Sequence, residues 1–122
     1  MVRVRIDTRV VYEFELPVWA VAAVGMELPA AARMQPVEEY GAVVPLFTTR
    51  EKAAEYVYRA AVSDHEPREL QHDQLAWLLD EIDDVGLRFV GFDVGHDGKG
   101  TEGFYVPFHN VRAALLIDHL GA

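Results

Sequence analysis

The segment from Val43 to Glu51 limits the possible folds more than any other part of the chain. An apolar run containing one proline stops at Thr48 and Thr49, and a helical pattern begins directly afterwards. The glutamate three residues after Thr48 completes a capping box, in which Thr48 and Glu51 satisfy free amides at a helix start. The segment therefore predicts a strand that passes directly into a helix near the middle of the chain.

Composition narrows the class of protein. The chain has 122 residues, which is room for one domain with one core. It contains no cysteine, which excludes disulfides, thiol nucleophiles and thiolate metal sites. Its net charge of −9 repels phosphate backbones and anionic membranes, so we expect neither as a partner. Charges interrupt the apolar start, and the most apolar run, residues 18–26, is too short to span a bilayer. We therefore expect a cytoplasmic protein.

Residues 2–16 alternate strictly in character. Even positions are apolar except for Thr8, and most odd positions are charged, which indicates β structure with one buried face. The segment is either one long strand or two strands bent around Thr8, and no glycine marks a tight turn. In a hairpin, opposite charges would pair across the strands: Arg3 and Arg5 with Glu13 and Glu15.

The other elements follow from periodicity and from breaker residues. Residues 18–24 are a buried strand or a short helix, and their valine content favours the strand. Residues 27–41 contain two prolines and little periodicity, which predicts a long connection. Further strands are expected over 42–47, 87–94 and 104–106, and helices over 49–61, 69–85 and 109–120. The chain is thus predicted to be a single α+β domain with a mixed or antiparallel sheet of about four to six strands and about three helices mainly on one face.

Apolar stripes predict which sides of the helices are buried. The first helix has Ala53, Val57 and Ala61, with Ala54 and Tyr58 alongside, and the last has Val111, Leu115, Leu116 and Leu120. The middle helix has a leucine stripe on one side and an acidic face on the other, which is formed by Asp73, Asp80, Glu81, Asp83 and Asp84.

Residues 43–120 resemble the SseB-like family of bacterial proteins. The resemblance is carried by VPLFTTREKAAEYV (44–57), WLLDEIDDVGLRFVGFDVG (77–95) and FYVPFHNVRAALL (104–116). The first matches a family segment of the form vPvFT, and the second ends near the position of a family turn of the form NP-G or DP-G. Here the turn is Asp93-Val94-Gly95, without the proline, and residues 1–42 form a β-rich extension and connection. The resemblance implies an α/β domain, and it brings no catalytic residue set.

One group of side chains could form a metal-dependent or hydrolytic site: Asp93, His96, Asp97 and His109. Histidine and carboxylate side chains ligate divalent ions, and Asp93 lies at the carboxyl end of a predicted strand, where sites in α/β proteins often occur. The competing interpretation, which we favour, is that Asp97-Gly98 and Lys99-Gly100 are turns of a mobile surface loop with His96 in solvent. No ligand spacing of a known type is present, and we expect no cofactor.

Aromatic residues suggest a second kind of site. Tyr40, Trp77, Tyr105 and Phe108 would form a partner surface if several of them are exposed together. The favoured function is therefore a non-catalytic interaction or regulatory module that binds a protein partner or forms a homodimer through its amino-terminal β region or its acidic helix. Two alternatives remain: the Asp/His enzyme, and a small-ligand binder that uses residues 27–41 as a lid.

Overall fold

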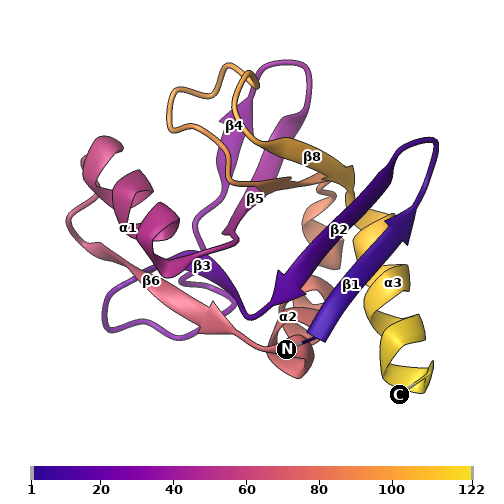
Figure 1. Cartoon of the computed structure of the whole chain (residues 1–122). Helices are drawn as coiled ribbons and strands as arrows, with labels where there is room; N and C mark the ends of the chain where they lie inside the picture. The colour runs from indigo at the N-terminus through magenta and orange to yellow at the C-terminus, as the bar shows by residue number, and fades with distance from the viewer. Residues whose placement is uncertain (1, 122) are drawn as a thin grey trace.

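The computed structural model describes residues 2–121, with side chains for residues 2–116. The strands are β1 (Val2–Asp7), β2 (Val11–Leu16), β3 (Val18–Ala23), β4 (Gln35–Val37), β5 (Gly41–Phe47), β6 (His65–Leu70), β7 (Phe89–Phe92) and β8 (Phe104–Pro107). The helices are α1 (Arg50–Arg59), α2 (His72–Glu81) and α3 (Phe108–Gly121), with a 3₁₀ turn η1 (Asp83–Val85). The predicted α+β class is confirmed (Figure 1).

Strand β5 organises the larger sheet. Six strands form this sheet in the order β6-β3-β5-β7-β8, and β4 pairs with the amino-terminal half of β5. The β5–β7 pair is parallel, whereas β3 and β4 on the other side of β5 are antiparallel to it. The prediction of a mixed sheet is confirmed. Because β5 and β7 run in the same direction, their carboxyl ends meet at one edge of the sheet.

The alternating segment 2–16 is a hairpin. Strands β1 and β2 form a separate two-stranded sheet in which Val2 lies opposite Leu16. The expected charge pairs are present, since Arg3 lies 3.3 Å from Glu15 and Arg5 lies 3.7 Å from Glu13. The buried side of the hairpin packs against the core, with the ring of Phe14 centred 4.8 Å from that of Phe92.

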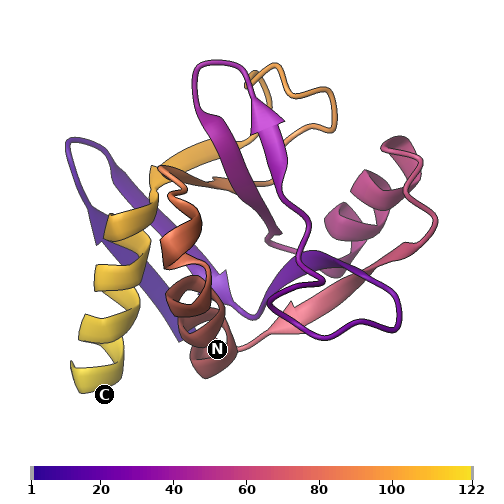
Figure 2. The same cartoon turned by 180° about the vertical axis from the view of Figure 1, so that it is seen from behind.

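The side chains of β5 alternate between the two faces of the sheet. Val44 and Leu46 belong to the main core, which also contains side chains of α2, α3 and the hairpin. Phe47 points to the opposite face, where it packs with Ala53 and Tyr56 of α1. Two of the three helices therefore cover one face of the sheet and α1 covers the other, and Figures 1 and 2 show α1 and α3 on opposite sides of the molecule.

Residues 18–41 form two strands and a connection that packs against the sheet. Residues 18–23 form β3, which lies inside the sheet between β6 and β5, so the strand interpretation of this segment is confirmed. The connection 27–41 contains β4, and Ala32 makes an isolated bridge to Ala22 of β3. This connection is thus bound to the sheet through backbone hydrogen bonds.

The prediction of a helix over 69–85 was wrong at its amino end. Residues 65–70 form β6, an edge strand that pairs with β3 from Val18–Leu70 to Ala23–His65. Pro67 is tolerated because an edge strand leaves one row of amides unpaired. Helix α2 begins only at His72. The strand was not predicted because the residues of β6 are mostly polar and show no apolar alternation, and its pairing with β3 depends on backbone hydrogen bonds.

The predicted stripes of the outer helices also need correction. In α1 the buried residues are Ala53 and Tyr56, whereas Tyr58 is 86% exposed, because the sheet meets the helix on its Tyr56 side. In α3, Val111 and Leu115 are buried but Leu116 is 60% exposed, and the side chain of Leu120 lies outside the described residues. Among the helices described over residues 2–121, none has the length and apolar character needed to cross a bilayer.

Candidate functional site

The ends of the parallel strands β5 and β7 are joined by side chains. Thr48 follows β5 and Asp93 follows β7. The Thr48 backbone amide donates to Asp93 Oδ1 at 2.8 Å, and the Thr48 hydroxyl donates to Oδ2 at 2.8 Å. The Asp93 backbone has a φ of 54°, a left-handed conformation that aspartate adopts more readily than most residues. Asp93 thus connects the two strand ends.

This contact corrects the predicted capping box. The helix cap is Thr49, whose hydroxyl accepts from the Lys52 amide at 3.1 Å. Thr48 lies one residue too early and uses its hydroxyl on Asp93 instead. Lys52 reaches back from the first turn of α1, with its Nζ 3.3 Å from Asp93 Oδ2. A carboxylate, a hydroxyl and an ammonium group therefore meet where the two strands end.

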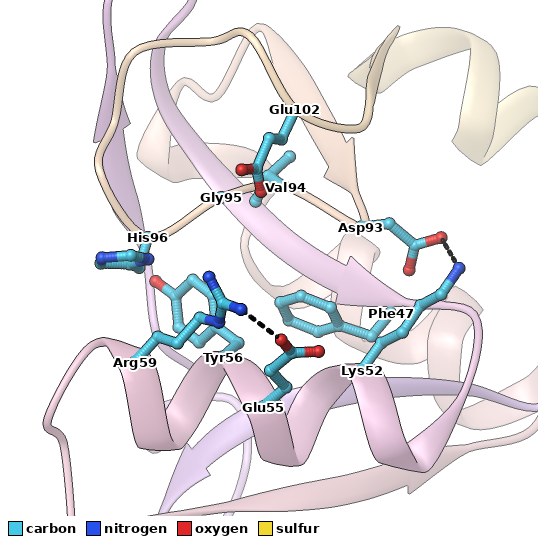
Figure 3. A pocket seen from close by; sticks show the side chains of 10 residues that line it. All are labelled: Phe47, Lys52, Glu55, Tyr56, Arg59, Asp93, Val94, Gly95, His96 and Glu102. Atoms are coloured by element: carbon cyan, nitrogen blue, oxygen red, sulfur yellow. Dashed lines mark hydrogen bonds and ion pairs between the residues drawn. The ribbon is translucent and has the colours of Figure 1, made fainter.

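A pocket of about 300 Å³ opens beside this junction. One face of α1 supplies Lys52, Glu55, Tyr56 and Arg59, which follow the i, i+3, i+4, i+7 spacing of a single helix side. The other lining residues come from the end of β5 and from the segment after β7: Phe47, Asp93, Val94, Gly95, His96 and Glu102. Figure 3 shows these side chains arranged around an opening between α1 and the 93–102 segment.

The charged groups of this pocket divide into paired and unpaired side chains. Lys52 is paired with Asp93, and Arg59 Nη2 lies 2.8 Å from Glu55 Oε1 (Figure 3). Within the described side chains, Glu102 makes no hydrogen bond or ion pair. The pocket therefore contains one carboxylate whose charge no neighbour neutralises.

A buried hydrogen-bond network supports the rear of the pocket. The Tyr56 hydroxyl donates to Gln35 Oε1 and accepts from Arg33 Nε at 3.0 Å. Gln35 Nε2 in turn donates to the Gly95 carbonyl at 2.9 Å. Gln35 is 4% exposed and is the buried polar residue of the described core. Three distant segments, β4, α1 and the 93–102 loop, are therefore held in a fixed relation.

The glycines of the loop after β7 allow the backbone to pack closely against its neighbours, instead of making the loop mobile. A Cβ atom on Gly103 would lie 2.2 Å from the Phe92 carbonyl oxygen, and one on Gly98 would lie 2.8 Å from the Pro36 carbonyl oxygen. The Glu38 amide also donates to the Gly98 carbonyl at 2.8 Å. The loop is thus docked against the β4–β5 hairpin at Gly98 and against the end of β7 at Gly103, and a side chain at either glycine would push it away from that neighbour.

The four predicted metal or catalytic candidates do not gather at one point. Asp93 and His96 line the pocket of about 300 Å³, whereas His109 lines a separate pocket between α2 and α3. The Asp97 carboxylate accepts from the Lys99 amide at 3.0 Å, which is the turn chemistry of the competing interpretation. Among the described side chains, no group of three or more histidine, aspartate or glutamate residues is placed to hold one metal ion.

The four aromatic candidates do not form one surface either. Tyr105 is 9% exposed and Phe108 4% exposed, because Tyr105 packs in a small cluster with Val43 and Val94 and Phe108 belongs to the main core. Tyr40 is half-buried and stacks on Tyr105 with ring centres 3.9 Å apart. Trp77 alone of the four is well exposed, at 45%. Burial, followed by the charge of the neighbouring Tyr40, raises the pKa of Tyr105 above its ordinary value of 10.0.

Trp77 lies in a second pocket, of about 600 Å³, which we name the α2–α3 groove. Its lining residues come from one side of each helix: His72, Asp73, Ala76, Trp77 and Asp80 of α2, and His109, Arg112, Ala113, Leu115 and Leu116 of α3. The two helices are tied together at this groove by Arg112, which contacts Asp80 and lies 3.0 Å from Asp83.

Only parts of these two sites could be predicted from the sequence. Neither pocket includes a residue of the 27–41 connection, so the connection does not act as a lid over either one. Lys52, Glu55 and Arg59 were not singled out, because a charged helix side normally faces solvent. The i, i+3, i+4, i+7 spacing that they share with Tyr56 was the sequence pattern that could have identified them.

No family model, curated protein or solved structure matches this chain. The SseB-like resemblance stays a prediction from the sequence.

Proposed function

We propose that this protein is a cytoplasmic, non-catalytic interaction module that binds a protein partner in the α2–α3 groove. The observation that carries the proposal is the exposure of Trp77 and Leu116, at 45% and 60%, on either side of the same groove. The small side chains of Ala76 and Ala113 lie in the groove with them. Exposed tryptophan beside a hollow is the typical composition of an interface hot spot.

The shape of the groove favours a helical segment as its occupant. Two packed helices that leave an apolar channel between them accept an amphipathic helix, whose large side chains fill the channel. Here the alanines leave room for such side chains, while Trp77 and Leu116 supply apolar contact area at the edges.

The charge of the groove favours a basic partner. Residues 72–85 contain five acidic residues and no lysine or arginine; Arg112 of α3 pairs with two of them, Asp80 and Asp83, so the surface around the groove stays acidic, and the whole chain has a net charge of −9. A second copy of the chain would bring the same negative charge to the interface, whereas a helix with lysine or arginine beside its apolar stripe would complement it. The proposed partner is therefore a basic amphipathic segment of another protein. The SseB-like resemblance, which brings no catalytic residues, supports the same class of function.

Site-specific photo-cross-linking in cells of the source organism tests this proposal. A photoreactive phenylalanine analogue is placed at Trp77 and, as a control, at Tyr58, which is an exposed aromatic residue of α1. We expect a discrete adduct from position 77 and none from position 58. The adduct should disappear with Leu116→Asp and persist with Val85→Asp, since Val85 is also exposed but lies outside the groove.

Two results would decide against this form of the proposal. Equal adducts from positions 77 and 58, or no adduct at either position, would show that the groove is not a binding surface. An adduct with the mass of two chains, together with a dimer in light scattering, would replace the basic partner with a second copy.

A further inference from the structure

We propose that the pocket between α1 and the 93–102 segment binds a small organic ammonium ion, a primary amine carried on a compact apolar or aromatic body. The pocket lies outside the carboxyl ends of the parallel strands β5 and β7, the edge of a sheet where open α/β proteins hold their ligands. Its volume of about 300 Å³ admits a single small molecule.

The charges of the lining favour a cation. Each basic side chain already has an acidic partner, since Lys52 contacts Asp93 and Arg59 contacts Glu55. Glu102 is the third carboxylate of the lining, and no described side chain pairs with it. A ligand with one positive charge would neutralise the pocket, whereas an anion would add to the excess negative charge. The net charge of −9 would also raise the local concentration of cations.

Gly95 allows the Glu102 carboxylate to reach the pocket. A Cβ atom on Gly95 would lie 2.9 Å from Glu102 Oε2, so the carboxylate occupies the space that any larger residue would fill. Figure 3 shows Glu102 extending from the loop toward Gly95, across the opening from α1. Glu102 is exposed, so replacing its carboxylate with a neutral amide should leave the fold intact.

The body of the ligand would contact apolar and aromatic groups. Phe47, Val94 and Tyr56 contribute to the lining, and the rings of Phe47 and Tyr56 are centred 5.1 Å apart. Tyr56 is held by the hydrogen bonds of its hydroxyl to Gln35 and Arg33, so the site is formed before a ligand arrives. Aromatic faces also attract ammonium groups.

Three probes of similar shape and different charge test the proposal: phenethylammonium, phenylacetate and 2-phenylethanol. Each is titrated into the isotopically labelled full chain, and binding is followed by amide chemical shifts. We expect saturable shifts with phenethylammonium, centred on Glu55, Tyr56, Gly95 and Glu102. Its dissociation constant should be at least about tenfold lower than that of either other probe, as a charge-assisted hydrogen bond contributes.

Matched variants separate the local site from the overall charge. Glu102→Gln should weaken phenethylammonium binding by about tenfold, and Gly95→Ala should weaken it by displacing the Glu102 carboxylate. Glu81→Gln removes one negative charge from the exposed end of α2, outside the pocket, and should leave binding unchanged. Leu116→Asp should also leave it unchanged, so this result is independent of partner binding in the α2–α3 groove.

Three outcomes would overturn the inference. They are the absence of saturable shifts with phenethylammonium, equal or tighter binding of phenylacetate, and equal effects of Glu102→Gln and Glu81→Gln. The last would show that only the overall charge of the protein attracts the probe. Thermal unfolding of each variant by circular dichroism confirms that the fold is retained.

Discussion

The Asp93 carboxylate binds both the backbone amide and the hydroxyl of Thr48, at 2.8 Å in each case. These two residues are separated by 45 positions in the chain, and their contact closes the edge of the sheet where β5 and β7 end. The Asp93 side chain is only 18% exposed, so its hydrogen bonds are largely shielded from water.

A double-mutant cycle will measure this contact. Asp93→Asn keeps the shape of the side chain and tolerates the left-handed backbone, but it removes the charge that strengthens both hydrogen bonds to Thr48 and the ion pair with Lys52. We expect Asp93→Asn and Thr48→Val each to lower the free energy of unfolding in urea by about 1–3 kcal/mol. Their effects should be coupled by about 0.5 kcal/mol or more. The loss of stability from Thr49→Val, which removes the helix cap, should simply add to the loss from Asp93→Asn. If Asp93→Asn were coupled to Thr49→Val but not to Thr48→Val, the assignment of Thr48 as the partner of Asp93 would be contradicted.

The Tyr56 hydroxyl should be important for stability. Tyr56→Phe keeps the ring in its contact with Phe47 but leaves Gln35 Oε1 buried without its donor. We expect a loss of about 1–3 kcal/mol in the free energy of unfolding, measured by urea denaturation. Tyr58→Phe changes an exposed hydroxyl on the same helix and should have no measurable effect. Equal stability of the two variants would show that water replaces the missing donor.

Gly103 should tolerate alanine much less well than Gly25. Both have a left-handed backbone, with φ of 78° and 80°, so alanine strains each by about 1–2 kcal/mol. Only at Gly103 would the new Cβ atom also lie 2.2 Å from a carbonyl oxygen, whereas Gly25 has nothing within 4 Å. We expect Gly103→Ala to cost about 1–3 kcal/mol more than Gly25→Ala in urea denaturation. Similar costs would mean that the loop moves away from β7 without penalty.

Tyr105 should make the protein less stable at high pH. Its pKa is raised above 10.0 in the folded state by burial, so the folded chain keeps the phenol proton when the unfolded chain has lost it. The stability contributed by the protonated phenol is complete below about pH 10 and is lost as the pH rises through the folded-state pKa. We expect the free energy of unfolding to decline less steeply above pH 10 in Tyr105→Phe than in the parent chain. Tyr58→Phe, at an exposed position, should follow the parent chain, and identical slopes for all three proteins would contradict the prediction.

Local patterns predicted much of the fold. The hairpin charge pairs, the strand at 18–23 and the three helices follow from side-chain periods of two and 3.6, which neighbouring residues in the sequence define. Strand β6 was missed because His65–Leu70 has no apolar alternation, and its place at the sheet edge depends on backbone bonds to β3. The burial of Tyr105 and Phe108 was missed for a related reason, since short elements do not show which neighbours will cover them.

The candidate sites were harder to predict from the sequence than the fold was. Asp93 and His96 were identified and both line one pocket, whereas Asp97 lies beside Gly95 with its carboxylate accepting from the Lys99 amide, and His109 lies in the α2–α3 groove. Lys52, Glu55 and Arg59 looked like an ordinary solvated helix side. Their role as a pocket wall depends on the 93–102 loop, which Gln35 holds at the Gly95 carbonyl.

The sequence by itself determined most of the strands and helices, together with the buried side of the β1–β2 hairpin and of α2, because these properties depend on residues a few positions apart. Only the tertiary structure decided that Thr48 binds Asp93 while Thr49 caps α1. Two adjacent threonines offer the same hydroxyl, and the parallel pairing of β5 with β7 places one of them against a carboxylate 45 residues away. The same pairing creates the edge of the sheet beside which the pocket between α1 and the 93–102 segment lies, since a site built from distant segments exists only once those segments are packed together.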